Sequence, residues 1–293
     1  MIQKVIEIDQ RYRSSWDVRA IAHVVHISPT TVADILREVR GPRPRLAKHP
    51  HRGRTCFIDR DVMWSSDFMD LLGRQGDLPG KRYLLKTLDE TSRFRVGWEV
   101  LPAETAQAVV RHAEDLLRRA GHAPLVWKYD HGSQFTSDAF QGFLTYHQIV
   151  PFPIPPRAPW VNGRTERDNQ EIQNWLIPVW DKGLSDVELE RDVDEGMWML
   201  NYIKPRMVLG YQTSAQVYFA KESMIEEGGR EWLLDQLRQI KDMLWPMSGE
   251  RLQRKAVRMW LQQMGFYEEW EEIPKDAVTG ETVNRSPDED VAF

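Results

Sequence analysis

The sequence predicts an α/β protein in which helices flank a mixed five-stranded sheet, with a small all-α domain before the sheet and a helical extension after it. Three observations carry this prediction. Strand-like runs alternate with amphipathic helical patterns between residues 61 and 182, two short helical patterns come before that region, and helical periodicity prevails after residue 184. A length of 293 residues suits one main domain with an appendage at each end.

Composition indicates a chain that can bury a core and contains no membrane span. Hydrophobic residues make up 41% of the sequence, 12 residues are Trp, and the mean hydropathy is −0.54 with no long uncharged apolar run. Cys56 is the single cysteine and has no disulfide partner in the chain, and the first residues, MIQKVIEIDQRYR, lack the apolar core of a signal peptide. We therefore expect no membrane partner and a location in the cytoplasm.

The net charge of −5 is the sum of two regions of opposite sign. Residues 1–60 contain 12 Lys and Arg against 6 Asp and Glu, whereas residues 266–293 contain 2 against 9. A basic front is typical of proteins that bind nucleic acid. Two solvated surfaces of opposite charge would give the same counts.

Residues 1–40 have the pattern of a helix-turn-helix domain. Apolar residues recur at helical spacing in two successive stretches, and Ser28, which is followed by Pro, suits the N-cap of the second helix. In a DNA reader this second helix would offer Thr30, Thr31 and Arg37 to the major groove. An ordinary helical hairpin in a small bundle is the alternative.

Residues 41–60 are predicted to be a basic linker. Within it, GPRPRLAKHPHRGRT has five Lys and Arg, no acid, three Pro and two Gly, so it cannot bury a core. An extended basic chain follows phosphates well, and we expect Arg43, Arg45 and Lys48 to contact DNA. A linker that is merely solvated is equally compatible with this composition.

Five strand patterns and the helices between them define the main domain. Gly121 should end the first of these helices, which follows the third strand. The expected strands are residues 62–72, 81–89, 94–102, 125–130 and 149–155. Three strands in succession followed by alternating helices and strands predict a mixed sheet covered by helices.

Three carboxylates stand in unusual positions within this framework. Asp130 closes the strand LVWKYD, and Asp67 lies in mid-strand among apolar residues in WSSDFMD, where an uncompensated charge is costly. Glu166 begins a helix whose apolar face is separate from the polar stripe that contains Glu166. Glu171 lies on the same helix, and Glu171→Gln is expected to be nearly silent.

Carboxylates that converge from two strands and a helix repel one another unless cations neutralise them. Hard oxygen ligands favour Mg²⁺ or Mn²⁺. Two such ions, about 4 Å apart, can activate a water or a 3′-hydroxyl and stabilise the leaving oxygen in phosphodiester displacement. Each acid taken alone is more often structural, so the order and context of the three carry the hypothesis.

The motifs around these acids resemble the integrase catalytic core of DDE transposases, an RNase H-like group that includes retroviral integrases and bacterial insertion-sequence transposases. The resemblance runs from about Met63 to Tyr218 through WSSDFM, YLLKTLDETSR, VGW, YDHGSQFT, PWVNGRTER and LGYQTSA. Thirty-five residues separate Asp130 from Glu166, as in the family pattern.

The resemblance implies an RNase H-like fold and assigns a role to each acid. Asp67, Asp130 and Glu166 would be the catalytic metal ligands for two Mg²⁺ or Mn²⁺ ions per active site. Arg164 and Arg167, next to Glu166, would position DNA phosphates. The partners would be DNA, both element ends and target, and further copies of the same chain in a homo-oligomer.

The predicted function is therefore a transposase or integrase that cleaves DNA at mobile-element ends and joins the 3′-hydroxyls to target DNA. A host-adopted or regulatory DNA-binding protein with the same fold, and a nuclease that cannot join strands, are the alternatives. The predicted divisions are residues 1–40, helix-turn-helix; 41–60, basic linker; 61–220, catalytic core; 221–272, helical C-terminal region; and 273–293, acidic tail without fixed structure.

Overall fold

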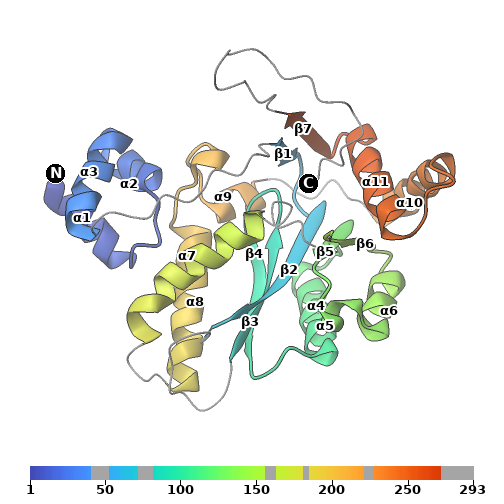
Figure 1. Cartoon of the computed structure of the whole chain (residues 1–293), viewed down its shortest axis with the longest axis horizontal. Helices are drawn as coiled ribbons and strands as arrows, with labels where there is room; N and C mark the ends of the chain where they lie inside the picture. The colour runs from blue at the N-terminus through green and yellow to red at the C-terminus, as the bar shows by residue number, and fades with distance from the viewer. Residues whose placement is uncertain (41–52, 72–81, 156–162, 181–184, 221–226, 272–293) are drawn as a thin grey trace.

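A five-stranded mixed sheet forms the centre of the molecule. The computed structural model describes residues 1–40, 53–71, 82–155, 163–180, 185–220 and 227–271. The sheet consists of β2 (Met63–Asp70), β3 (Tyr83–Asp89), β4 (Arg95–Leu101), β5 (Val126–Tyr129) and β6 (Val150–Pro153), in the order β4-β3-β2-β5-β6 (Figure 1). β2, β3 and β4 are antiparallel neighbours, whereas β5 is parallel to β2 and β6 to β5. The predicted five strands and the mixed sheet are confirmed.

Helices cover both faces of the sheet. α4 (Ala106–Ala120), α5 (Ser133–Thr136) and α6 (Asp138–Tyr146) pack on one face, and α7 (Gly163–Trp180) and α8 (Asp186–Tyr202) on the other. Neighbouring residues of β3 show the division, because Leu85 belongs to the cluster with α4 and Leu84 to the cluster with α7 and α8. Gly121, at a φ of 75°, ends α4 as the sequence predicts.

The N-terminal region is a three-helix unit that packs against the core. It consists of α1 (Ile2–Arg11), α2 (Val18–Val25) and α3 (Pro29–Arg40), of which α1 was not predicted. Trp16 and Ile21 are buried in the same apolar cluster as Trp175 and Leu176 of α7. The unit is therefore docked on the core rather than held by a tether alone. Val39 of α3, in contrast, is 48% exposed.

The chain after α8 closes the far edge of the sheet. It contains the 3-10 helix η2 (Met207–Leu209), α9 (Ser214–Phe219), α10 (Glu227–Met243) and α11 (Gly249–Gln263). Trp260 of α11 is buried in the same apolar cluster as Phe152 of β6, and Gln253 donates a hydrogen bond of 2.8 Å to the Pro151 carbonyl. Arg230 of α10 donates to backbone carbonyls in the connections that precede β5 and β6. These contacts cover an edge strand that would otherwise be open to pairing.

A two-stranded ribbon corrects two predicted boundaries. β1 (Gly53–Phe57) lies inside the predicted basic linker, and β7 (Tyr267–Glu271) lies inside the predicted helical C-terminal region. The two strands pair antiparallel, with Phe57 opposite Tyr267. Pairing between segments about 200 residues apart leaves no local signal beyond strand propensity. The predicted acidic tail, residues 273–293, lies outside the described residues, and within the described ones no helix is long and apolar enough to cross a membrane.

The contact between α7 and α8 generates a stability prediction. A Cβ atom at Gly196 of α8 would lie 2.5 Å from Cδ1 of the buried Trp175. We expect Gly196→Ala to lower the free energy of unfolding by about 1–3 kcal/mol, because the indole must move within a packed core. Gly142→Ala in α6, where no atom lies within 4 Å of the added Cβ, should leave stability equal or raise it by up to about 1 kcal/mol. Urea denaturation of both variants measures the difference, and equal stabilities would contradict the close packing.

Candidate active site

The strand register brings Asp67 and Asp130 together. β2 and β5 are parallel, with Met63 opposite Val126 and Ser65 opposite Lys128. Two further residues along each strand place Asp67 beside Asp130, which directly follows β5. Adjacent strands lie about 4.8 Å apart, so the two carboxylates are neighbours on one face of the sheet.

The surroundings of Asp67 disfavour its negative charge. Burial raises the pKa of this carboxyl group, and the charges of Asp130 and Asp168 raise the pKa further. The ammonium of Lys86 and a hydrogen bond from Asn169 act in the opposite direction. A third carboxylate brought to this position would therefore need a countercharge, which a divalent cation held by oxygen ligands supplies.

Helix α7 brings a polar face to Asp67. The Asn169 amide donates a hydrogen bond of 2.9 Å from Nδ2 to Oδ2 of Asp67. Glu166 precedes Asn169 by three residues and so lies next to it on the helix surface, one turn nearer the N-terminus, with its side chain exposed. An open hollow here is lined by Glu166, Arg167, Asn169, Gln170 and Gln173. The predicted polar stripe of this helix is thus present and faces solvent.

The predicted three-carboxylate group is assembled in part. Asp67 and Asp130 are adjacent, and Glu166 lies one helical turn from the residue that contacts Asp67. Among the residues that the structure describes, no three His, Cys, Asp or Glu side chains form a group with the spacing of metal ligands. The role of all three as metal ligands stays a prediction, supported by their oxygen chemistry and by the pKa of Asp67.

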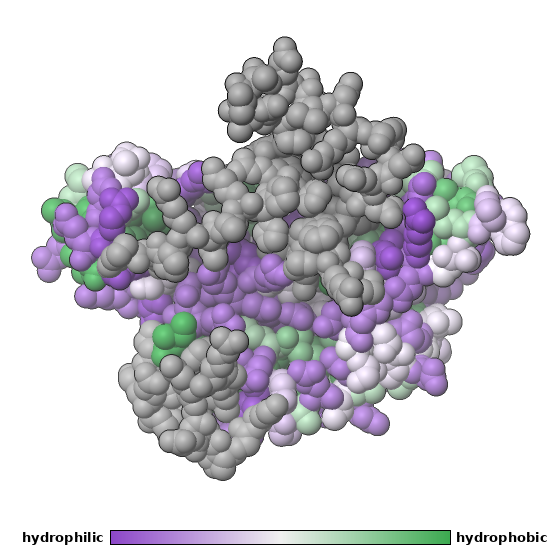
Figure 2. Space-filling model, viewed as in Figure 1, coloured by the Kyte–Doolittle hydropathy of each residue, from purple (hydrophilic) through white to green (hydrophobic). Residues whose placement is uncertain are grey.

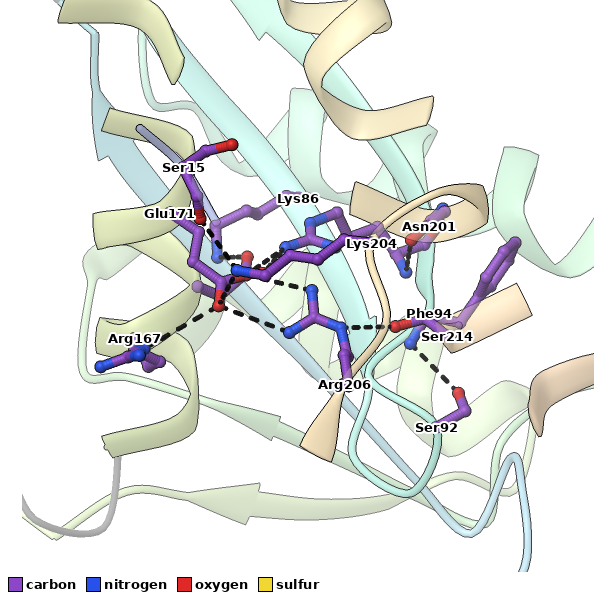
Figure 3. A network of polar contacts seen from close by, with 12 residues as sticks. Ser15, Lys86, Ser92, Phe94, Arg167, Glu171, Asn201, Lys204, Arg206 and Ser214 are labelled. Atoms are coloured by element: carbon purple, nitrogen blue, oxygen red, sulfur yellow. Dashed lines mark hydrogen bonds and ion pairs between the residues drawn. The ribbon is translucent and has the colours of Figure 1, made fainter. Parts of the chain in front are cut away.

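Buried ion pairs fix α7 on the sheet (Figure 3). Asp168 accepts a 2.7 Å contact from Nζ of Lys86 on β3 and is also paired with Arg95 on β4. Glu171, one turn further along, lies 3.0 Å from Nζ of Lys204 and 3.0 Å from Nη2 of Arg206. All of these side chains are at most 11% exposed.

The expectation that Glu171→Gln would be nearly silent is therefore wrong, because Glu171 belongs to this buried network. The charges of Arg206, Lys204 and Arg95 outweigh burial and hold the pKa of Glu171 well below its usual range. Removing one partner of a buried pair costs about 3–5 kcal/mol, because it leaves the other charge uncompensated. A glutamate in a polar helical stretch is usually solvated, but Glu171 is buried and is paired with cations from β4 and from the segment after α8.

A second buried group anchors the start of α7. Glu90, at the end of β3, contacts Nζ of Lys128 at 2.5 Å and Nη1 of Arg164 at 2.9 Å. The Arg164 guanidinium also lies over the Phe57 ring, 5.3 Å from its centroid. Its charge is committed to Glu90, so this geometry favours a structural role for Arg164 over the predicted DNA contact. In the LDETSR motif, Asp89 accepts hydrogen bonds from the backbone N–H and the hydroxyl of Ser92, and these bonds shape the turn after β3.

The other predicted DNA contacts divide into exposed residues and residues outside the described structure. Arg167 is 61% exposed at its side chain, beside Glu166. Thr30, Thr31 and Arg37 are exposed on α3, and the predicted cap is present, with Ser28 Oγ accepting from the backbone N–H of Thr31 at 3.1 Å. The predicted contacts of the linker, Arg43, Arg45 and Lys48, lie outside the described residues.

A hydrophilic band crosses the centre of the face seen in Figure 1, between the N-terminal and the C-terminal helices (Figure 2).

Sequence reasoning did not single out Lys86 and Asp168, and it gave Asn169 no role beyond the polar stripe. Lys86 did leave a signal, because it is a charged residue in mid-strand within YLLKTLD, as Asp67 is within WSSDFMD.

Comparison with known proteins agrees with this architecture. Residues 60–159 match the family model of the integrase core domain. A chain of the simian T-cell lymphotropic virus intasome, solved in complex with PP2A regulatory subunit B56 gamma, is similar at a TM-score of 0.51 and 17% identity, over 70% of this chain and 72% of that one. The HTLV-2 integrase catalytic core domain in complex with magnesium has a TM-score of 0.44 and 20% identity, over 55% and 98% of the two chains. The catalytic core domain of BIV integrase gives 0.44 and 20%, over 55% and 95%.

The family match over residues 60–159 and the mixed sheet with its flanking helices support an RNase H-like integrase core fold and the DDE transposase and integrase superfamily. At 17% identity the intasome likeness shows the fold alone. The sequence matches none of the curated proteins. Together the family match and the fold support an enzyme of the polynucleotidyl transferase type.

The oxygen ligands around Asp67 generate a metal-binding prediction. Mg²⁺ or Mn²⁺ should raise the midpoint of thermal unfolding, because a ligand at a hundredfold excess over its Kd stabilises the folded state by about 2.7 kcal/mol. The increment should shrink as the pH falls, since the pKa of Asp67 is raised and protons then compete with the cation.

Asp67→Asn should remove most of this metal-induced shift, which differential scanning fluorimetry measures. Asp242→Asn, at an exposed position near the end of α10, is the matched control and should retain the shift. An equal response of both variants would exclude Asp67 as a ligand.

Proposed function

We propose that this protein is a DDE-type transposase or integrase that cleaves DNA at mobile-element ends and joins the 3′-hydroxyls to target DNA. The observation that carries the proposal is the placement of Asp67 beside Asp130 on adjacent parallel strands, with α7 presenting Asn169 to Asp67 and Glu166 one turn away. The exposed polar face of α3 in the same chain supports a role for this helix in reading DNA.

The chain's own residues would prepare the site. Asp67, Asp130 and Glu166 would hold the divalent cations, which when bound activate the attacking water or 3′-hydroxyl and stabilise the leaving oxygen. Asn169 orients the Asp67 carboxylate, and the charge of Lys86 favours its ionised form. Arg167, exposed beside Glu166, is placed to contact a phosphate. The DNA-bound form is proposed to be a homo-oligomer, because both ends of an element must be brought to one target.

The charge of Glu166 provides the decisive test. Glu166→Gln keeps the size of the side chain and its helix propensity but weakens a ligand for hard cations, so cleavage and joining should fall by orders of magnitude while binding of end DNA persists. The same loss is expected for Asp67→Asn and Asp130→Asn. Labelled end DNA incubated with purified protein and Mg²⁺ or Mn²⁺ measures both steps.

Glu190→Gln is the matched control, because Glu190 is exposed on α8. It should retain the activity of the unmodified protein. Strand transfer that survives Glu166→Gln would refute the three-carboxylate mechanism. Cleavage without joining in the unmodified protein would favour a nuclease, and DNA binding without either step would favour a host-adopted or regulatory DNA-binding protein.

The recognition helix generates a separate prediction. Arg37 is 63% exposed on α3 and pairs with Asp34 three residues before it. If Arg37 reads a base, Arg37→Ala should weaken specific binding by about 1–3 kcal/mol while changing binding to random DNA far less. Arg118→Ala is the control, because Arg118 is 75% exposed and forms the same kind of pair with Asp115 on α4.

Binding of the full chain should weaken as salt rises, since phosphate contacts release counterions. Fluorescence anisotropy across a salt series, with specific and random duplexes, measures both effects. If Arg37→Ala and Arg118→Ala bind the specific duplex equally well, α3 does not read bases through Arg37.

A further inference from the structure

The three-helix unit of α1, α2 and α3, to which the proposed function assigns DNA reading, is called the reading unit below. A short segment between α1 and α2 holds it on the core. This segment makes a tight turn in which Arg13 and Ser14 have φ values of 47° and 57°, a conformation that is strained for residues with a Cβ. The turn directs the next residues toward α7 and α8. Trp16 is 4% exposed, and its indole N–H lies 3.2 Å from Sδ of Met199 on α8.

Arg13 adds polar contacts to both helices of the core face. Its guanidinium lies 4.3 Å from the centroid of the Trp175 ring and donates to the Trp175 carbonyl at 3.3 Å. The same group lies 3.3 Å from Oδ1 of Asp192 on α8. Planar stacking combined with two directional contacts restricts the orientation of the docked unit more than apolar packing alone would.

Lys204 joins the reading unit directly to α7. Its ammonium donates to the Ser15 carbonyl at 2.9 Å and lies 3.0 Å from Oε1 of Glu171 (Figure 3). It also lies 3.8 Å from Oδ2 of Asp17, whose Oδ1 caps the N-terminus of α2. Lys204 is 1% exposed. One buried charge therefore connects the first helix of the helix-turn-helix with the helix that carries Glu166.

The late motif LGYQTSA and the residues just before it also contact the reading unit. The rings of Tyr211 and His23 on α2 are stacked, with centroids 4.1 Å apart and an interplanar angle of 6°. Arg19, also on α2, lies 3.0 Å from Sδ of Met207. These contacts use α2 and the turn before it and leave Thr30, Thr31 and Arg37 of α3 exposed. The reading face can thus meet DNA while the unit stays docked.

We propose that Lys204, together with the stack of Tyr211 on His23, forms a positioning device that holds the DNA-reading helices at a fixed distance from Glu166. The protein would thereby measure the separation between the sequence it recognises and the bond it cuts. The inference rests on the proposed function. Lys204 and Tyr211 act through the placement of two helices and are positioning residues rather than catalytic ones.

DNA geometry makes the device testable. A base pair adds about 3.4 Å along the duplex axis and rotates the site by about one-tenth of a turn. Two inserted base pairs therefore move the cut by about 7 Å and about 70° relative to the recognised sequence. A rigid dock cannot follow this displacement, and even an insertion of one full turn leaves the cut about 34 Å away.

The experiment uses the full chain and a duplex that this chain selects from a randomised pool, with its cleavage point mapped in Mg²⁺ or Mn²⁺. Variants of that duplex carry 1, 2, 5 or 10 additional base pairs, on the order of a tenth to one full turn, between the selected sequence and the cut. In the duplex with two added base pairs, the unmodified protein should cut the displaced bond at least tenfold less than it cuts the same bond in the selected duplex. Activity should not return with a full-turn insertion.

Lys204→Met and Tyr211→Ala should each lower this discrimination at least fivefold, because the reading unit can then shift relative to Glu166. The discrimination of each variant is the ratio of its cleavage of the selected duplex to its cleavage of the lengthened duplex. A general loss of stability lowers both rates and leaves this ratio unchanged. Tyr211 is partly exposed and lies outside the reading unit, so Tyr211→Ala decides the question if Lys204→Met fails to fold. Lys255→Met, at an exposed position on α11, is the control and should keep the strict spacing.

The outcomes separate this inference from the proposed function. If the unmodified protein cuts no duplex, the proposed function fails. If it cuts all spacings equally, or again after a full-turn insertion, the reading unit is not rigidly held and the inference is overturned. Strict spacing that persists in both Lys204→Met and Tyr211→Ala overturns the assignment of these residues.

Discussion

The attachment of α7 by buried charge is the constraint on which the rest of the structure depends. Asp168 and Glu171 lie one helical turn apart and are paired with cations from β3, from β4 and from the segment after α8. Burying so many charges costs free energy, and well-packed apolar residues can be as stabilising as a buried ion pair. Ion pairs with short, directional contacts do, however, accept few alternative alignments of a helix. Their main effect here is to fix where along the sheet α7 lies.

That alignment determines the candidate active site. Asn169 directly follows Asp168, so the pair between Lys86 and Asp168 sets the position from which Asn169 reaches Asp67. A shift of one helical residue would rotate α7 by 100° and carry Asn169 away from the sheet. The apolar half of the helix, with Trp175 and Leu176 in the core, stabilises α7 but makes no directional contacts of the kind that the ion pairs provide.

Sequence reasoning recovered what local pattern encodes. The strand alternation located all five strands of the sheet, and Asp130 was correctly placed at the end of β5. The separate apolar face and polar stripe of the helix placed Glu166 at its start, and the structure has Glu166 in the first turn of α7. Periodicity shows which side of an element faces the core, but it does not show which distant residue supplies a partner. Glu171 was misjudged for this reason, since its partner Arg206 lies 35 residues away.

The docking of the N-terminal unit was missed for the same physical reason. Residues 41–60 have the composition of a tether, and composition reports how a segment behaves in isolation. A set of contacts from Arg13, Trp16 and His23 to α7, α8 and the late motif holds the N-terminal helices in place. None of these residues has a distinctive spacing in sequence. An aromatic or basic residue in a turn is usually solvated, and only the fold shows that Arg13 and Trp16 pack against the core and that the exposed His23 of α2 stacks on Tyr211.

The position of Asp67 is unfavourable for the fold taken alone. An apolar residue at this position in β2 would avoid both the burial that raises the Asp67 pKa and the repulsion from Asp130. The surrounding structure instead supplies Lys86 and the Asn169 amide, which partly offset the cost without removing it. Local arrangements that lower stability and are held by their surroundings occur preferentially at functional sites. The ion pairs beneath α7 keep the helix in place over this carboxylate. The network that sets the geometry of the candidate site therefore also holds Asn169 where it partly offsets the free-energy cost of burying Asp67.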